Sequence, residues 1–355
     1  SRVDMDRKQA EDRLEKDWQA YPHDMDVCHF YGGDLQGIMH KLDYLQDLGV
    51  EVIYFNPLFV SPSNHKYDIQ DYDYIDPHYG KIVDDGGEVL PNGVTDNSQA
   101  TKYKKRTTGL KNLEASNELF IKLVEELHRR GMKVSLDGVF NHTGSQSRYF
   151  NADGFYSTLG AAQSTESPYY DWYSFHPWPE DYDAWWGIKT LPAVREEAES
   201  YLDYIIDGPD SVVRRWLRAG ASGWRLDVAD ELPDWFIRKI RAAAEETKPD
   251  AVLLGEVWED ASNKIAYSKR RKYLLGDELH GVMNYPFRTA LLAYLQGGDA
   301  DGFRDAMETL RENYPPAAFS SLMNFLGTHD TPRILTVLGA DRIPESKEER
   351  AIYRL

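Results

Sequence analysis

The sequence has 355 residues, of which 41% are hydrophobic and 13% aromatic, and its formal net charge is −18 at pH 7. A chain of this size can form one barrel-sized domain or two smaller ones. The acidic balance argues against a nucleic-acid partner, which needs a basic surface, and no run of about 18 apolar residues offers a membrane span. The single cysteine, Cys28, excludes an internal disulfide framework.

Apolar runs and helical spacing alternate along the chain. Residues 34–49 are predicted to form a helix, and 50–59 a strand. The remaining expected elements are a helix at 116–131, a strand at 132–142, a helix at 211–220, a strand at 223–229, a helix at 232–248, strands at 251–258 and 281–287, helices near 287–296 and 301–313, a strand at 321–330 and a helix beginning at 346–355. Six strands separated by helices indicate a parallel α/β sheet.

Two long segments interrupt this alternation. Residues 61–115 are polar, and residues 143–200 are rich in aromatic side chains. Long loops in compact domains are usually functional. Both segments follow the C-terminal end of a predicted strand, which is the face that carries the active site in α/β barrels.

The strand predicted at 223–229 carries an unusual pair of charges. Side chains alternate between the two faces of a strand, so Arg225 and Asp227 point to the same side. Burying such a pair has a large desolvation cost. A fold keeps it for a structural network or for chemistry.

Polar side chains gather at the ends of four predicted strands. They are Asp137, Asn141 and His142, then Arg225 and Asp227, then Glu256, and finally His329 and Asp330. Any one of them alone reads as a helix cap, an ion-pair partner or a structural histidine. Together, at the ends of parallel strands, they predict a catalytic site at one mouth of the sheet.

The chemistry that suits this set is glycosidic bond cleavage. One carboxylate attacks the anomeric carbon and another protonates the leaving oxygen, and aromatic rings can stack on sugars. Arg225 would keep Asp227 ionised as the nucleophile, while Glu256, after an apolar strand, suits general acid work. The sequence contains no phosphate-binding glycine loop or HExxH helix, and its histidines lack zinc spacing. Retention of configuration predicts carboxyls roughly 5–5.5 Å apart.

Four ordered segments, "DGVFNH", "GWRLDVADE", "LLGEVWE" and "FLGTHD", resemble the signature segments of the α-amylase superfamily, glycoside hydrolase family thirteen. "GGDLQGI", "SPSNHKYD" and "IDPHYG" resemble its neopullulanase and cyclomaltodextrinase branch, and "KRTTGLKNLEASN" and "WWGIKTLP" resemble amylopullulanases of Gram-positive bacteria. The resemblance covers nearly the whole chain. It implies an α/β fold, a (β/α)8 TIM-type barrel with a domain B insertion after the third strand.

The resemblance also implies roles for individual residues. Asp227 is implied as nucleophile, Glu256 as acid/base and Asp330 as transition-state stabiliser. The implied substrate-binding residues are Tyr67, Asp137, His142, Arg225, His329, Arg333 and Trp186. Asn141 is implied as a ligand of a structural calcium, and the chemistry itself is expected to need no cofactor. The expected partner is an α-glucan.

The expected organisation is a first barrel part at 1–142 with the long loop 61–115, a domain B-like insertion at 143–200 and a second barrel part at 201–355. Only strands two to seven of eight are expected. With no initiator Met and a helix cut at Leu355, the chain is expected to be a piece of a larger enzyme. Oligomeric state is left open, and so is the compartment, with an extracellular or cell-surface location favoured slightly over a cytoplasmic one.

Several functional alternatives stay open at this point. A hydrolase of α-1,4 bonds, and also of α-1,6 bonds, shares its covalent intermediate with a transglycosylase. "TLPAVREE" stands where relatives continue "TLPKLN", which leaves branch-level specificity open. A non-catalytic member, such as a transporter accessory ectodomain, and a sugar-binding module are disfavoured because all three carboxylates are present. The acidic loop with Asp84, Asp85 and Asp96 is either solvated or a metal loop.

Overall fold

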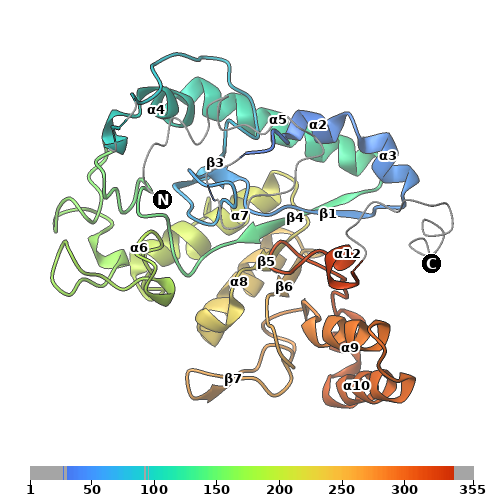
Figure 1. The fold of residues 1–355 in the computed structure, drawn as a ribbon. Helices are drawn as coiled ribbons and strands as arrows, with labels where there is room; N and C mark the ends of the chain where they lie inside the picture. The colour runs from blue at the N-terminus through green and yellow to red at the C-terminus, as the bar shows by residue number, and fades with distance from the viewer. Residues whose placement is uncertain (1–26, 28–29, 92, 95, 340–355) are drawn as a thin grey trace. The chain divides into compact units, whose positions relative to one another are not determined.

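The structure is a computed structural model that describes residues 27, 30–91, 93–94 and 96–339. The chain divides into two compact units, Ser1–Val252 and Leu253–Leu355 (Figure 1). The helix predicted at 346–355 lies outside the described residues. No helix among the described residues combines the length and apolar character needed to cross a membrane.

The first unit is built around three parallel strands. They are β1 (Val52–Tyr54), β4 (Lys133–Gly138) and β5 (Gly223–Leu226), and β4 pairs with both of the others. These strands confirm the predictions at 50–59, 132–142 and 223–229, although each is shorter than its apolar run. Parallel strands are covered on both faces, which explains why all four residues of β5 are buried.

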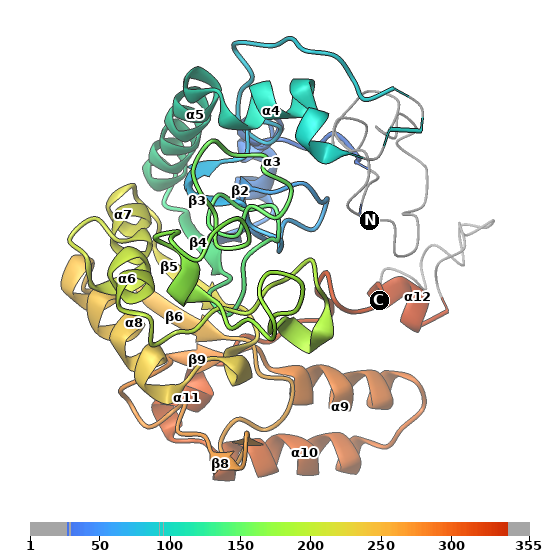
Figure 2. The same cartoon turned by 90° about the vertical axis from the view of Figure 1, so that its left-hand side faces the viewer.

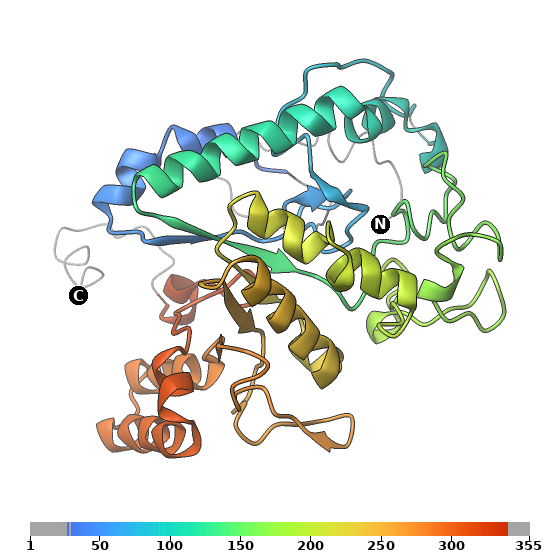
Figure 3. The same ribbon diagram turned by 180° about the vertical axis from the view of Figure 1, so that it is seen from behind.

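Three helices of the first unit lie on one side of these strands, as Figures 2 and 3 show. They are α5 (Leu110–Arg129), α7 (Val212–Arg218) and α8 (Asp234–Thr247). The buried positions of α5 recur at helical spacing and include Phe120, Leu123 and Leu127. The helix begins six residues before the predicted start because its apolar stripe extends back to Leu113.

The single helix predicted at 34–49 is wrong. The structure has two short helices, α2 (Leu35–Met39) and α3 (Leu42–Asp47). Asp34 caps the first of them and accepts a hydrogen bond from the amide of Gly37 at 2.7 Å. The buried residues Leu35 and Leu42 stand seven positions apart, so the apolar periodicity continues across the break and hides it.

The polar segment 61–115 contains more regular structure than its composition suggests. Within it, β3 (Asp71–Ile75) pairs antiparallel with β2 (Phe59–Val60), which directly precedes the segment, and a short 3-10 turn, η2 (Asn97–Gln99), precedes α4 (Thr101–Thr108). Tyr103 of α4 packs with Leu90, Ala100 and Phe155 in a small hydrophobic cluster. This segment therefore has a local core that fixes α4.

The segment after β4 contains many aromatic rings that pack on one another. Its short elements are η3 (Tyr170–Trp172), η4 (Trp185–Gly187) and α6 (Glu199–Leu202), which runs into the π-helical η5 (Asp203–Asp207). The Trp172 ring lies 5.0 Å from both the Tyr149 and the Tyr201 ring centroids. Some of the aromatic residues of the segment 143–200 therefore pack against one another within the fold.

In the second unit, β6 (Val252–Gly255) pairs in parallel with β9 (Gly281–Val282). The other elements are the hairpin of β7 (Ile265–Ala266) and β8 (Lys269–Arg270), the adjacent helices α9 (Tyr285–Leu295) and α10 (Ala300–Asn313), and the short helices α11 (Pro316–Ser320) and α12 (Ile334–Val337). The strand predicted at 321–330 is wrong, because this stretch forms only one isolated parallel bridge, Met283 with Met323.

Candidate active site

A buried charge cluster stands at the ends of β4 and β5 in the first unit. Arg225 Nη1 donates to Asp227 Oδ1 at 2.7 Å and to Asp137 Oδ1 at 3.1 Å. The register pairs Asp137 with Arg225 across neighbouring strands, and alternation brings Asp227 to the same face two residues later. The structure therefore brings together three of the residues that the sequence singled out.

Two tyrosines complete the surroundings of Asp137. Tyr54 and Tyr67 both donate their hydroxyl groups to Asp137 Oδ2, the latter at 2.8 Å. Tyr54 stands on β1, and Tyr67 comes from the loop between β2 and β3. Burial, together with the negative charge of Asp137, raises the pKa of both phenols far above the ordinary value. Both hydroxyls therefore stay protonated and act as donors.

The cluster carries one positive and two negative formal charges. Burial alone would lower the pKa of Arg225, but the carboxylates of Asp137 and Asp227 outweigh it and hold that pKa well above its ordinary value. Arg225 is 1% exposed and Asp227 is 7% exposed. A formal net charge of −1 is thus held in a largely water-excluded place, where it interacts strongly with any developing positive charge.

The backbone turns sharply directly after Asp227. Val228 has φ 39° and ψ 58°, the left-handed region that a β-branched side chain rarely adopts. The Asp227 amide still donates to the carbonyl of Gly138 at 3.2 Å, so the turn begins one residue beyond the sheet. Strained backbone of this kind concentrates at functional sites, where it fixes a side-chain direction.

His142 begins a line of stacked rings. Its Nε2 donates to the carbonyl of Tyr67 at 3.1 Å, and burial lowers its pKa to about 4, so the ring is neutral at pH 7. Trp185 stacks on His142 with ring centroids 5.7 Å apart, and Trp186 stacks on Trp185 at 5.0 Å. Trp186 is 80% exposed and has φ 50°. The stack therefore runs from a buried imidazole to an exposed indole.

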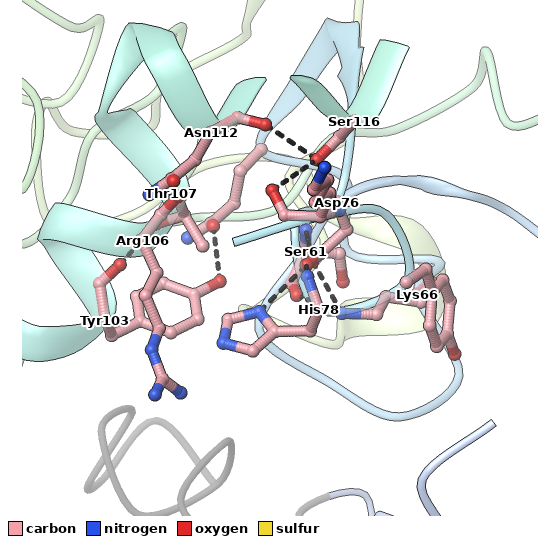
Figure 4. A network of polar contacts seen from close by, with 12 residues as sticks. Ser61, Lys66, Asp76, His78, Tyr103, Arg106, Thr107, Asn112 and Ser116 are labelled. Carbon is pink, nitrogen blue, oxygen red and sulfur yellow. Dashed lines mark hydrogen bonds and ion pairs between the residues drawn. The ribbon is translucent and has the colours of Figure 1, made fainter. Parts of the chain in front are cut away.

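The loop that carries Tyr67 is held by a network that the sequence did not reveal. Buried Lys66 donates from Nζ to Asp76 Oδ2 at 2.6 Å and to the carbonyl of Ser61 at 2.7 Å, and His78 Nδ1 lies 2.9 Å from Asp76 Oδ1 (Figure 4). Burial alone would raise the pKa of Asp76, but Lys66 and His78 outweigh it and hold that pKa well below its ordinary range. The lysine inside "SPSNHKYD" was the only sign of this network in the sequence.

Asn141 follows β4 and is the residue implied as a calcium ligand. Its Oδ1 is buried and has no hydrogen-bond partner among the described residues. No three His, Cys, Asp or Glu side chains in the described part of the chain converge as metal ligands. Asp84 and Asp85 instead pair with Lys105 and Arg106. Ca²⁺ takes six to eight oxygen ligands, and the amide oxygen of Asn141 supplies one of them. The described side chains therefore do not by themselves form a calcium site, and calcium at Asn141 stays a prediction.

The second unit contains the other predicted site residues. Glu256 follows β6, is 5% exposed and accepts a hydrogen bond from Trp258 Nε1 at 2.9 Å. Trp258 in turn stacks on Tyr285 with ring centroids 4.2 Å apart. Sequence reasoning missed Trp258, although it stands two residues after Glu256 and could share its side of an extended chain.

His329 and Asp330 differ from the buried cluster. His329 Nε2 lies 3.1 Å from Asp330 Oδ2, and both side chains are partly exposed. Arg333 is also exposed, at the start of α12. The convergence of Glu256, His329, Asp330 and Arg333 with Asp227 stays a prediction.

Comparison with known proteins identifies the class. The model of the alpha-amylase catalytic domain matches residues 5–86 and 115–354. The chain therefore belongs to the α-amylase family, a family of glycoside hydrolases, as the four sequence segments predicted.

Individual members of the family are similar to this chain over most of its length. It is 38% identical to an amylopullulanase from Thermoanaerobacter thermohydrosulfuricus, over 91% of this chain and 21% of that protein. It is 35% identical to neopullulanase 2 from Thermoactinomyces vulgaris, over 88% of this chain and 46% of that protein. The type III pullulan hydrolase from Thermococcus kodakarensis matches with a TM-score of 0.73 at 29% identity, over 95% of this chain and 51% of that one. The chain thus spans about half or less of these relatives.

Proposed function

We propose that this chain is the catalytic part of a retaining α-glucan hydrolase that cleaves α-1,4-glucosidic bonds. The observation that carries the proposal is the contact of one buried guanidinium, that of Arg225, with both Asp137 and Asp227. A carboxylate held ionised and oriented in this way is suited to attack carbon. The names of the relatives, amylopullulanase, neopullulanase and pullulan hydrolase, support pullulan, and with it α-1,6 bonds, as further substrates to test.

The first proposed step breaks the glycosidic bond. Asp227 uses one carboxylate oxygen to form a bond with the anomeric carbon, while the bond from that carbon to the glycosidic oxygen breaks. Glu256 gives its proton to the departing oxygen, which leaves as a sugar hydroxyl. Glu256 is left as a carboxylate, and the donor sugar is an ester of Asp227.

The second proposed step releases the sugar. Glu256 takes a proton from a water molecule, whose oxygen attacks the anomeric carbon, and the ester bond to Asp227 breaks. If a sugar hydroxyl replaces water, the same step is transglycosylation. Two inversions leave the α configuration unchanged.

The buried cluster would stabilise the transition state of each step. The sugar ring develops positive charge as the bond breaks. The formal charge of −1 shared by Asp137, Arg225 and Asp227 stabilises that charge, and Asp330 is proposed to add to it. Tyr67, fixed by its hydroxyl on Asp137, presents its ring to the sugar. Neutral His142 adds no opposing positive charge.

Two finer points of the fold stay predictions beside this proposal. One is that residues 143–200 form a domain B. The other is that the chain contributes strands two to seven of a (β/α)8 barrel.

Product analysis tests the proposal directly. The chain is incubated with maltoheptaose, starch, cyclodextrins and pullulan, products are separated by thin-layer chromatography, and the first anomer released is observed by proton NMR. We expect the α-anomer first, and products larger than the substrate would reveal transglycosylation. Release of the β-anomer first would contradict retention. A crystal structure with the carboxyls of Asp227 and Glu256 about 9 Å apart would contradict it independently.

A further inference from the structure

The loop 61–70, between β2 and β3, carries Tyr67 and ends at Gln70, which is fully buried. The Gln70 side chain is hydrogen-bonded through both of its polar atoms. Its Nε2 donates to the carbonyl of Gln146 at 3.3 Å, and its Oε1 accepts a hydrogen bond from the Tyr103 hydroxyl at 2.8 Å. Tyr103 belongs to α4, so a helix later in the chain holds the end of the loop that carries Tyr67.

The same tyrosine supports the middle of the loop through a second contact. Its ring stacks on His78, with ring centroids 5.9 Å apart and an interplanar angle of 12° (Figure 4). His78 Nδ1 donates to Asp76 Oδ1 at 2.9 Å, because an ionised carboxylate can only accept. The other oxygen of Asp76 accepts from Lys66 Nζ at 2.6 Å. Tyr103 therefore packs on the group that holds the residue directly before Tyr67.

The backbone at Lys66 depends on these supports. Lys66 has φ 67°, in the left-handed region that costs energy for a residue other than glycine. Its side chain is fully buried, and its Nζ lies 5.0 Å from the centroid of the Tyr79 ring. Such a conformation persists only where the surrounding contacts over-determine it. The direction in which the chain presents Tyr67 therefore depends on the contacts around Asp76.

α4 lies outside the part of the chain that matches the family. The alpha-amylase model matches residues up to 86 and again from 115. The helix has anchors other than the loop 61–70, since Arg106 pairs with Asp85 at 2.7 Å and the Tyr103 ring lies 5.6 Å from the Phe155 ring. α4 is therefore a support that this chain adds to the matched part of the fold.

We propose that Tyr103 is a positioning residue that acts on Tyr67 through the loop 61–70. Its hydroxyl and its ring support two points of that loop, which keeps the Tyr67 hydroxyl on Asp137 and directs the Tyr67 ring to the proposed sugar site. The effect on hydrolysis rests on the proposed function, whereas the effect on the loop does not. A misplaced ring is felt most while charge develops on the sugar, so kcat suffers more than KM.

Hydrogen exchange in the free protein tests the support of the loop and needs no substrate. The reporting amides, which are hydrogen-bonded, are those of Ser61, Lys66 and Gln70. Tyr103→Phe removes the donor to Gln70 but keeps the ring. It should speed exchange of these amides about fivefold, the value of one hydrogen bond, and exchange in β4 by less. An equal rise in the loop and in β4 would show a general loss of stability and would overturn the proposal.

The contact of the ring with His78 is tested by Tyr103→Leu, which removes the hydroxyl and the stacked ring together. Exchange in the loop 61–70 should then be faster than in Tyr103→Phe, and the excess should be largest at Ser61, whose amide donates to Asp76 Oδ2 at 3.1 Å. Exchange no faster than in Tyr103→Phe would overturn the second contact.

Tyr156→Phe provides the matched control. The Tyr156 ring meets Phe155, a neighbour of Tyr103, at 5.3 Å, but its buried hydroxyl has no hydrogen-bond partner among the described residues. Loss of this hydroxyl should leave both kcat and exchange in the loop 61–70 unchanged. Equal effects of Tyr156→Phe and Tyr103→Phe would mean that packing of the cluster, rather than the bond to Gln70, holds the loop, and would overturn the proposal.

A double-mutant cycle tests the action through Tyr67. In the wild-type background, Tyr103→Phe should lower kcat for maltoheptaose about fivefold and change KM by less than about twofold. With Tyr67→Phe, which already lacks the hydroxyl on Asp137, the same substitution should lower kcat by less than about twofold. Equal factors in the two backgrounds would show that Tyr103 acts independently of Tyr67 and would overturn the proposal. If the wild-type chain hydrolyses no glucan, the proposed function fails, while the exchange comparison still decides whether Tyr103 holds the loop.

Discussion

The buried cluster of the first unit (Asp137, Arg225 and Asp227) and the exposed pair of the second unit (His329 and Asp330) differ in their access to solvent. Asp137 is fixed by Tyr54, Tyr67 and Arg225, and Arg225 is 1% exposed. The side chain of Asp330 is 37% exposed and pairs with His329 at 3.1 Å. Removing one partner from a buried pair leaves an uncompensated charge, whereas exposed pairs contribute little to stability. Stability should therefore report on the first region, and activity on both.

The largest effect is expected from Asp227→Asn. The amide oxygen still accepts from Arg225, so the fold should persist, but the nucleophile is lost and kcat should fall by roughly 10⁴-fold or more. Hydrolysis of maltoheptaose measures the first outcome and circular dichroism the second. Near-normal turnover by this variant, purified free of wild-type enzyme, would contradict the mechanism. Asp330→Asn is the matched variant in the second unit, where we expect lower kcat with unchanged stability.

The next largest effect separates the two regions by stability. Arg225→Met leaves Asp137 and Asp227 buried without their cation, and should cost about 3–5 kcal/mol of unfolding free energy. Arg333→Met removes an exposed arginine and should change stability by less than about 0.5 kcal/mol. Urea unfolding of the three proteins measures both. If Arg225→Met does not fold, Arg225→Lys, which keeps the charge, should fold with reduced stability. Equal stability of the Arg225→Met and Arg333→Met variants would contradict the comparison.

The sequence predicted the centre of the site better than its surroundings. Strand alternation placed Arg225 and Asp227 on one face, and the structure has them in contact. Tyr54 was missed because a tyrosine in an apolar strand reads as core, and only the pairing of β1 with β4 brings its hydroxyl to Asp137. Contacts between residues far apart in the sequence depend on strand register, which local patterns do not contain.

The same limit explains the two errors in the fold. Leu35 and Leu42 share a face in one long helix and equally in two short ones, so periodicity could not show the break between α2 and α3. The stretch 321–330 is apolar enough for a strand, but a strand also needs a continuous partner. Met323 alone makes the bridge to Met283, and Leu326 is exposed.

A smaller effect is expected from pH. The pKa of His142 is lowered to about 4 by burial from an ordinary value of 6.5, so as pH falls the unfolded chain takes up a proton before the folded one. Stability is therefore lost as pH falls from 6.5 towards 4, and between pH 7 and pH 5 this group should cost about 2 kcal/mol.

His142→Gln tests this pH dependence because glutamine does not titrate. The variant's unfolding free energy should fall between pH 7 and pH 5 by about 2 kcal/mol less than that of the wild type. Buried Asp71, whose pKa is raised to about 6, titrates in both proteins and cancels in the difference. Equal losses in urea unfolding at the two pH values would show that the ring is protonated as readily in the folded state as in the unfolded state.

The smallest effect concerns Trp186, which is exposed like Asp330 yet belongs to the first unit. An indole that is 80% exposed, stacked on Trp185 and held at φ 50° contributes little to the core. We propose that it contacts the substrate. Trp186→Ala should raise KM for maltoheptaose roughly fivefold, within the range of one ring stacking on a flat partner. Its kcat and unfolding free energy should change little. Tyr44→Ala, which removes another exposed ring of the same unit, should leave KM unchanged. If both variants raise KM equally, or if Trp186→Ala lowers stability by more than about 1 kcal/mol, the indole is a packing residue and does not bind substrate.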